Sequence, residues 1–422
     1  MDFREVESWL DEHVEGMVDL QAELTSRPAM GPENGGEGEA EKAAFLENYL
    51  QRCNLPEAVH YDAPDERVPS GHRPNFSVSL DGSTKARRIC IMTHLDVVPP
   101  GERTEDGGWK GWDSDPFELR RENGTIYGRG VEDNQQALVG AVFALRAVLE
   151  TVQGPAPPIT LLFVSDEETG SRLGLQYVLE EHAHIFNEED IILVPDGGNP
   201  QGDGIEIAEK SVLWLRFCVR GKQTHGSTPG EGINAFRAAS GLVNRLDERL
   251  HDAFDASNEL YDPPCSTFEP TLHQKNVPNV NTVPAEDIFC FDCRVLPTYD
   301  LDEVLGEIQQ ECASTDEKMG TNTEVEVINR LDAPPPTPED APAVRMLSAA
   351  LKEVRGIDAE TRGIGGSTVA AHFRRQGYPA VVWSTVNATM HQANEHCDIS
   401  NMLADSKVFA RLFTDIPEGC ER

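Results

Sequence analysis

Five histidine or carboxylate side chains of the kind that bind zinc lie in short polar segments of the chain. They are His94 in THLD, Asp133 in GRGVED, Glu168 in DEETG, Asp196 in VPDGG and His391 in MHQANEH. Zinc prefers nitrogen and oxygen donors in a low coordination number, and a catalytic zinc ion keeps a position open for water. Each residue alone has an ordinary alternative, because a single aspartate at a strand end often caps a helix and a single histidine often lies at the surface. We expect all five at strand ends of a single sheet, and this joint arrangement favours a metal site.

Three short apolar segments have the pattern of buried strands that deliver these residues. Ile89–Met92 is followed by a polar loop at His94. Thr160–Ser165 is followed by DEETG, and Ile191–Val194 is followed by PDGG. Helical patterns at Gln135–Glu150 and Leu173–Glu181 lie between the strands. Strands that alternate with helices predict an α/β fold with a mostly parallel sheet covered on both faces and a site at the carboxyl ends of the strands.

The middle of the chain has a different order of elements, which predicts an inserted domain. The expected order is strand, helix, strands with turns, helix and strand, at Val212–Val219, Asn234–Phe254, Thr271–Leu296, Leu301–Cys312 and Glu324–Ile328. The proline-rich linker Leu331–Pro342 follows, since proline runs continue neither a helix nor a central strand. We therefore predict a catalytic domain from residues 1–209 and 330–422, with a smaller α+β domain at 210–329 inserted into it.

The net charge of −37, from 73 acidic and 36 basic residues, limits the partners of the protein. Such a surface repels nucleic acid and anionic membranes, so we expect neither as a partner. Like charges at this density also oppose compaction at low salt, and screening relieves that repulsion. We interpret the charge as an adaptation to a salty cytoplasm; the alternative is an ordinary acidic protein.

The expected location is the cytoplasm. The amino terminus, MDFREVESWLDEHV, is acidic and amphipathic and lacks the pattern of a secretion signal. The nine cysteines show no disulfide spacing, and the closest pair, Cys290 and Cys293, lies in an alternating strand pattern. Residues three apart in a strand point to opposite faces, so this pair is not expected to bind one metal ion.

Eight motifs, in order along nearly the whole chain, resemble those of one family of metallopeptidases. They are THLDVVP, YGRGVEDNQ, SDEETGS, GKQTHGSTP, NVNTVP, FDCR, GIGGST and HQANEH. The family includes acetylornithine deacetylase, succinyl-diaminopimelate desuccinylase, glutamate carboxypeptidase and cytosolic dipeptidases. Each motif alone is weak evidence, whereas the ordered set is specific.

The resemblance implies two zinc ions per chain, with cobalt or manganese as substitutes. Asp133 would bridge them, His94 and Asp196 would complete one ion, and Glu168 and His391 the other. Asp96 would orient the imidazole of His94. Glu167 would be the general base, because a carboxylate beside a water shared by two cations can take its proton. The alternative for Glu167 is a solvated acidic loop.

Further residues resemble the family's substrate site. The family implies that His225 reaches the active site of a partner subunit in a homodimer and stabilises the oxyanion. Asn281 and Arg294 resemble the pair that binds substrate, although an arginine in a strand is more often an ion-pair partner. Gly365, Gly366 and Ser367 resemble the substrate-binding turn, where missing side chains permit close backbone approach.

Two departures from the family's pattern leave the substrate open. Thr368 is followed by Val369, where many members have aspartate, and Asp196 is typical of the peptidase branch although the motifs are closer to the deacylases. Our leading hypothesis is a hydrolase that cleaves the amide bond of a small N-acyl amino acid. The first alternative is a dipeptidase or carboxypeptidase on the same scaffold, and the second is a non-catalytic binding relative.

Overall fold

The computed structural model describes residues 3–415 and divides the chain into two compact units. The first unit holds the residues up to Ile207, Pro336–Thr361 and the residues from Thr368 onward, and the second holds Ala208–Pro335 and Arg362–Ser367. The short segment Arg362–Ser367 differs from the sequence prediction, which assigned it to the catalytic domain. Its contacts with the second unit include the backbone N–H of Gly363, which donates to the carbonyl of Leu260 at 2.6 Å.

The first unit is built on a sheet whose four central strands are parallel. The strand order is β1 (Val59–His60), β4 (Phe76–Leu80), β8 (Ile159–Val164), β5 (Ile89–His94), β9 (Ile191–Val194), β18 (Ala380–Val382), β10 (Gly204–Glu209) and β17 (Glu360–Ile364). β4 and β10 run antiparallel to their central neighbours β8 and β18. Every residue of β5, β8 and β9 is buried, as expected for parallel strands covered on both faces.

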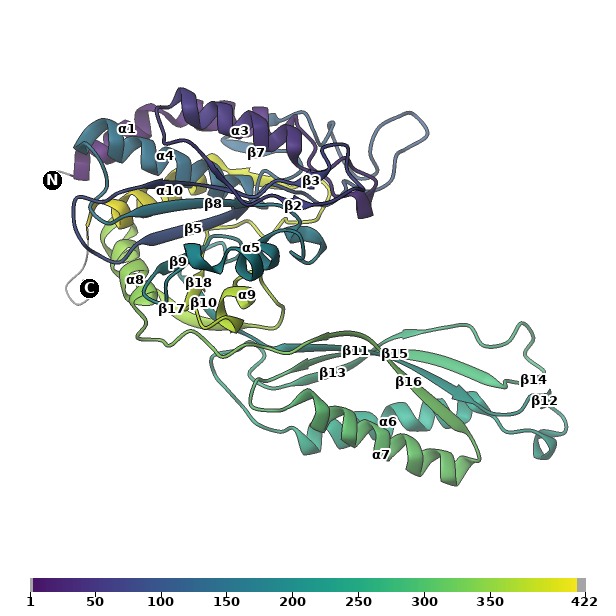
Figure 1. Cartoon of the computed structure of the whole chain (residues 1–422). Coiled ribbons are helices and arrows are strands. Elements are labelled where there is room, and N and C mark those ends of the chain that lie inside the picture. Colours follow the sequence, from purple (N-terminus) through teal and green to yellow (C-terminus); the bar gives the residue numbers. More distant parts are fainter. Residues whose placement is uncertain (1–2, 416–422) are drawn as a thin grey trace. The chain divides into compact units, whose positions relative to one another are not determined.

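Helices cover both faces of this sheet (Figure 1). On one face α4 (Gln135–Val152) packs against α10 (Ile399–Thr414), α1 (Phe3–Glu12) and α2 (Val14–Thr25), beside α3 (Ala40–Arg52). On the other face α5 (Leu175–Glu181) and α9 (Ala370–Arg375) share an apolar cluster with β5, β8 and β9. α8 (Pro342–Arg355) packs against α10. The predicted α/β fold with a mostly parallel sheet is confirmed.

Of the helices in the described part of the chain, α4 alone is long and apolar enough to cross a membrane by length and composition. However, 72% of it is buried inside the first unit. Its alanine and valine side chains meet other helices and the sheet, which is typical of a core helix.

Shorter elements line the edges of the first unit. β6 (Arg120–Glu122), β7 (Thr125–Tyr127) and β19 (His396–Asp398) form a small sheet, and β2 (Ala63–Pro64) pairs with β3 (His72–Arg73). Single 3₁₀ turns occur at Pro32–Asn34, Glu167–Thr169 and Ala183–Ile185. The Glu167–Thr169 turn directly follows the carboxyl end of β8 and is the one that matters for the site.

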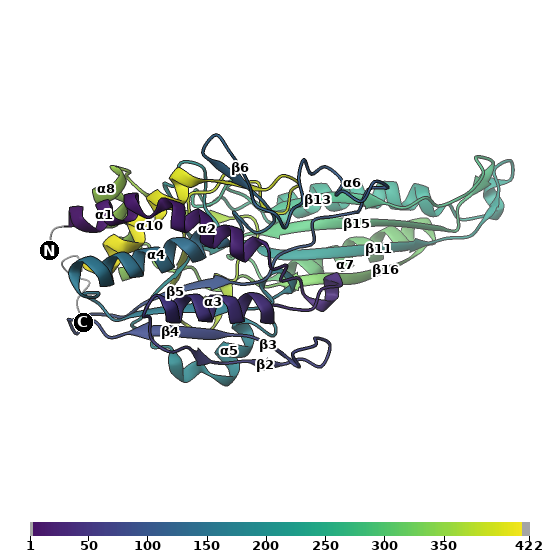
Figure 2. The same ribbon diagram turned by 90° about the horizontal axis from the view of Figure 1, so that it is seen from above.

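The second unit is a four-stranded antiparallel sheet with two helices on one face (Figure 2). The strand order is β13 (Thr267–His273), β15 (Glu286–Val295), β11 (Ser211–Arg220) and β16 (Asn322–Leu331), and the helices are α6 (Ala235–Ala253) and α7 (Leu301–Met319). Alternate residues of β11 and β15 are buried against both helices. A 3₁₀ turn at Pro229–Glu231 and the pair β12 (Thr224–His225) and β14 (Thr282–Val283) complete the unit.

The alternation of β15 confirms that Cys290 and Cys293 lie on opposite faces. Cys293 is buried in the apolar cluster, whereas Cys290 is half-buried on the other face beside Arg216. Both thiols are free. The pair therefore does not bind one metal ion.

Candidate metal centre

Three of the five proposed ligands follow neighbouring strands of the central sheet. His94 is the last residue of β5, Glu168 lies four residues after β8, and Asp196 lies two residues after β9. His94 is paired in register with Val164, the last residue of β8, so the ends of these two strands lie side by side. The carboxyl edge of the parallel strands thus gathers these three side chains, as the sequence predicted.

The expectation that all five lie at strand ends of a single sheet is wrong for Asp133 and His391. Asp133 lies in the turn before α4, and His391 lies in the loop between β18 and β19 with a left-handed backbone (φ 62°). These two segments are irregular, and buried side chains rather than a β-ladder hold them in place.

Asp133 stands between the two histidines. One carboxylate oxygen lies 3.0 Å from Nε2 of His94, and the other lies 3.1 Å from Nε2 of His391. Nε2 of His94 is also 3.4 Å from Oδ1 of Asp196, and Nε2 of His391 is 2.9 Å from Oε2 of Glu168. Both imidazoles therefore contact Asp133. In addition, His94 contacts Asp196 and His391 contacts Glu168.

This donor set fits a divalent metal centre, with two groups of three donors that share His94. His94, Asp133 and Glu168 form one group whose donor atoms lie within 4.8 Å of one another, and His94, Glu167 and Asp196 form another. Nitrogen and oxygen donors at this spacing suit zinc and similar divalent ions. Divalent cations would also offset the negative charge of the carboxylates gathered around the imidazoles.

Without cations, the negative charges of Glu167 and Glu168 are unfavourable, as the direction of their pKa shifts shows. Burial, with the negative charge of Asp196, raises the pKa of Glu167 well above its usual range. Burial and the charge of Asp133 raise the pKa of Glu168 to about 7. Hydrogen bonds to Asp133 and Glu168 raise the pKa of His391 to about 10. A cluster that attracts positive charge this strongly is suited to binding cations.

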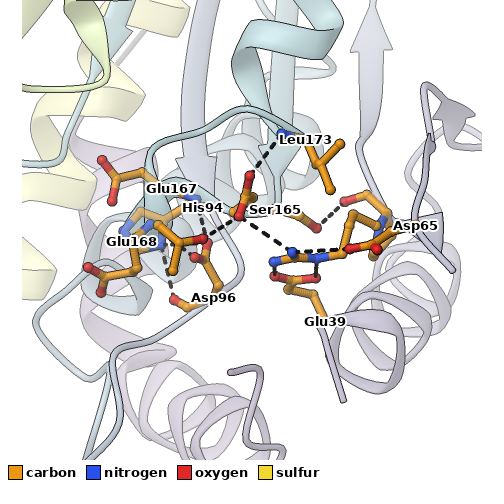
Figure 3. Close-up of polar contacts among 12 residues, drawn as sticks. Glu39, Asp65, His94, Asp96, Ser165, Glu167, Glu168 and Leu173 are labelled. Atoms are coloured by element: carbon orange, nitrogen blue, oxygen red, sulfur yellow. Dashed lines mark hydrogen bonds and ion pairs between the residues drawn. The ribbon is translucent and has the colours of Figure 1, made fainter. Parts of the chain in front are cut away.

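Asp96 holds the turn that carries Glu167 and Glu168 (Figure 3). Its two carboxylate oxygens accept hydrogen bonds from the backbone N–H groups of Glu167 and Glu168, each at 3.0 Å. Nδ1 of His94 is 3.1 Å from the backbone carbonyl oxygen of Asp96 and 3.5 Å from its carboxylate. Asp96 therefore contacts the imidazole as expected and, in addition, fixes the turn of the proposed base and ligand.

Sequence reasoning did not identify Asn134, which links two strand ends to the Asp133 turn. Its side-chain oxygen accepts a hydrogen bond from the backbone N–H of His94 at 3.2 Å. Its amide group donates to the carbonyl of Pro195 at 3.0 Å and to the carboxylate of Asp196 at 3.1 Å. Its place directly after Asp133 in GRGVEDNQ was the available signal, because residues beside a metal ligand often orient the other ligands.

The proposed substrate residues lie in the second unit as two groups. His225 and Asn281 are exposed neighbours, with Nδ2 of Asn281 3.5 Å from Nε2 of His225. Arg294 is paired with Asp292 by two hydrogen bonds of 2.6 and 3.0 Å, and it donates to the carbonyl of Gly365 at 3.0 Å. Arg294 therefore forms an ion pair with Asp292, which was the alternative to substrate binding. The same guanidinium connects the Gly365–Ser367 turn to β15.

The fold and the donor set define a metal-dependent hydrolase. Residues 90–415 match the peptidase family M20/M25/M40. The chain is 36% identical to an uncharacterized metallohydrolase of Methanococcus maripaludis, over 96% of this chain and 99% of that protein. It is 27% identical to the succinyl-diaminopimelate desuccinylase of Gluconacetobacter diazotrophicus, over 93% of this chain and 94% of that protein. The crystal structure of aminopeptidase PepT from Bacillus cereus shares the fold, with a TM-score of 0.72, 17% identity and coverage of 95% and 98% of the two chains.

The chain belongs to peptidase family M20/M25/M40 and is a metallohydrolase. The resemblance drawn from the eight motifs is thereby confirmed.

Proposed function

We propose that the protein hydrolyses the amide bond of a small N-acyl amino acid, such as an acetyl- or succinyl-amino acid. The observation that carries this proposal is Asp133 lying between His94 and His391, with Glu167 in the same cluster. Two zinc ions held by His94, Asp133, Glu168, Asp196 and His391 would acidify a water molecule and polarise the amide carbonyl. Cobalt or manganese would substitute for zinc.

Glu167 is the proposed general base. It accepts a proton from water as the water oxygen bonds to the carbonyl carbon, and it returns the proton to the nitrogen as the C–N bond breaks. The products are a free carboxylate and a free amine. Because Asp96 holds the backbone of Glu167, the base has a fixed position before substrate binds.

The Gly365–Ser367 turn and Arg294 are the proposed contacts for the substrate's carboxylate. A side chain at Gly365 or Gly366 would meet nothing within 4 Å, so packing does not require glycine at either position. An unhindered backbone is what close approach of a substrate needs. Arg294 fixes this turn through Gly365, and Asn281 and His225 supply further polar groups.

We propose a homodimer formed through the second unit, with His225 serving the partner's active site. β13 is an edge strand of the sheet, and beside it an apolar groove of about 390 Å³ is lined by Phe236, Val243 and Leu272. Phe236 is 47% exposed and Leu272 is 48% exposed. An open edge strand next to exposed apolar side chains is a surface that a second copy of the same element can cover.

A dipeptide is the second candidate substrate, and cleavage of a dipeptide or a carboxy-terminal residue needs the same chemistry. Asp196 favours it, since aspartate at this position resembles the peptidase branch. A non-catalytic binding relative is the third candidate; it is disfavoured because all five ligand positions and Glu167 lie together in one cluster.

We further propose a cytoplasmic location and an adaptation to salt, both from the sequence.

A hydrolysis screen tests the substrate. N-acetyl and N-succinyl amino acids are compared with dipeptides, each with and without a chelator. Turnover of acyl amino acids alone, abolished by the chelator, is the expected result. Turnover of dipeptides alone would replace the first candidate with the second, and binding without turnover would favour the third.

A further inference from the structure

Three consecutive residues contact the loop that carries the proposed base: Arg73, the last residue of β3, and Pro74 and Asn75, which join β3 to β4. This loop, residues 165–173, follows β8 and includes Glu167 and Glu168. The side chain of Arg73 is fully buried, and the proposed chemistry does not use it. A buried arginine beside a catalytic loop needs a physical reason, because removing its charge from water is unfavourable.

Pro74 and Asn75 tie both ends of the 165–173 loop to one segment. The backbone N–H of Ser165 donates to the side-chain oxygen of Asn75 at 2.9 Å, and its hydroxyl donates to the carbonyl of Pro74 at 2.6 Å. The amide group of Asn75 donates to the carbonyl of Leu173 at 2.9 Å. The loop therefore begins and ends at fixed points.

Asp166 is the contact of Arg73 within the loop. Nη1 of Arg73 lies 3.4 Å from a carboxylate oxygen of Asp166, and the other carboxylate oxygen accepts the backbone N–H of Leu173 at 2.8 Å. Asp166 has a left-handed backbone (φ 63°), which is unfavourable for a residue with a side chain. Its contacts hold it there, and its backbone sets the direction in which the next two residues, Glu167 and Glu168, leave the strand.

Glu39 holds the guanidinium of Arg73 in place through two hydrogen bonds. Nε of Arg73 donates to Oε2 of Glu39 at 2.7 Å, and a second, shorter bond joins Nη2 to Oε1. Both side chains are fully buried. Two parallel hydrogen bonds fix the plane of a guanidinium, and in that plane Nη1 lies 3.4 Å from Asp166 and 3.7 Å from Asp65.

We propose that Arg73 is a positioning residue for the Glu167–Glu168 turn. It fixes Asp166 on one side of the turn, and Asp96 fixes the backbone of Glu167 and Glu168 on the other. The inference rests on the proposed roles of Glu167 and Glu168. Arg73 touches neither the substrate nor the reacting atoms, so its loss changes the rate of the chemical step and the retention of the ion bound by Glu168, and leaves substrate binding unchanged.

The chain offers a matched control, the Arg88–Asp190 pair. Nε of Arg88 lies 3.2 Å from Oδ1 of Asp190, a second bond joins the same two side chains, and Arg88 donates to the carbonyl of Ile185 at 2.5 Å. Arg88 directly precedes β5, at the end of that strand away from His94. It is therefore a bidentate, partly buried ion pair of the same unit that is remote from the turn.

The experiment compares Arg73→Lys with Arg88→Lys. Each keeps a positive charge and loses the fork that makes two parallel bonds. Zinc affinity is measured by competition with a chromophoric chelator, and kcat and KM are measured on a substrate from the screen. For Arg73→Lys we expect weaker binding of one of two zinc ions and a lower kcat, each by roughly 10- to 100-fold, with KM within about threefold. For Arg88→Lys we expect zinc affinity and kcat near wild type even where the melting temperature falls.

Wild-type zinc affinity in folded Arg73→Lys protein would overturn the proposal, whatever its activity. Equal losses in both variants would overturn it too, because they would follow from general destabilisation. Should Arg73→Lys fail to fold, Arg73→Met combined with Glu39→Gln removes both buried charges and leaves neither unpaired; the same loss of zinc affinity is expected. The zinc measurement needs no substrate, so failure of the proposed reaction is distinguished from failure of this inference.

Discussion

Glu132 and Glu395 fix each other's segments: the carboxylate of Glu132 binds the loop that contains Glu395, and the carboxylate of Glu395 binds the turn that contains Glu132. The carboxylate of Glu132 accepts the backbone N–H groups of Asn387 and, at 2.6 Å, Thr389, in the loop that leads to His391. The carboxylate of Glu395, from that same loop, accepts the backbone N–H groups of Glu132 and Asp133, both at 3.0 Å. The two irregular segments that carry Asp133 and His391 are thus fixed against each other by buried carboxylates.

Replacing Glu132 with glutamine tests this relationship. The amide nitrogen would face a backbone N–H group, which leaves a buried donor without an acceptor. We expect the free energy of unfolding to fall by about 1–3 kcal/mol, measured by denaturant titration, and zinc to dissociate more readily. Glu122→Gln removes an exposed carboxylate paired with Arg120 and should change stability by no more than about 0.5 kcal/mol. Equal stability of Glu132→Gln and wild type would show that the loops do not depend on each other.

Asp133→Ala should lose both metal ions, because one carboxylate lies against both imidazoles. His391→Ala is the matched comparison: it removes a donor next to Glu168 and Asp133 and leaves the His94–Asp196 group intact. Metal analysis after dialysis should therefore give no ions for Asp133→Ala and one for His391→Ala. A tightly held ion in Asp133→Ala would contradict the bridging position.

Glu167→Gln keeps the shape of the side chain and removes the proposed base. We expect normal folding and metal content with activity lower by roughly two to four orders of magnitude, the usual contribution of a positioned acid–base group. Activity on the screened substrate and metal content are measured on the same preparation. Near-normal turnover would assign proton transfer to another group.

The sequence predicted the parts of the site that regular structure positions. The apolar segments of β5, β8 and β9 identified the sheet edge, and with it the positions of His94, Glu168 and Asp196. Asp133 and His391 could be named from their motifs but not located, since no periodic pattern describes an irregular loop. Their supports are backbone N–H groups that meet carboxylates more than 250 residues away in the chain.

In the second unit, too, regular elements were predictable from the sequence and contacts of irregular segments were not. Its alternating strands and amphipathic helices were predictable, because each buries one face. The position of Gly365 beside Arg294 was not, since that hydrogen bond joins residues 71 apart in the chain through a backbone carbonyl. Pairing of this kind leaves no signal in a single sequence.

The net charge of −37 leads to a prediction about salt. The melting temperature should rise between dilute buffer and about 1 M potassium chloride, because screening weakens the repulsion among surface carboxylates. Sucrose at matched osmolality is the control for exclusion of solute from the protein surface, which stabilises without screening. A flat or falling curve in potassium chloride, or an equal rise in sucrose, would show that the acidity is not an adaptation to salt.

Complementation between two inactive variants tests whether His225 serves a partner chain. His225 belongs to the second unit, and Glu167 and the proposed metal ligands belong to the first. Glu167→Gln and His225→Ala are unfolded together and reassembled. In a mixed dimer with exchanged histidines, one site combines the intact Glu167 of one chain with the intact His225 of the other, and the second site carries both changes.

Random assembly gives about half mixed dimers, each with one working site, so activity should recover to roughly a quarter of wild type. Each variant refolded alone is the control and should stay inactive. If His225 acts within its own chain, every site keeps one change and mixing restores nothing. Sedimentation of the wild-type protein at assay concentrations completes the test, because a fully active monomer would exclude a histidine supplied by a second chain.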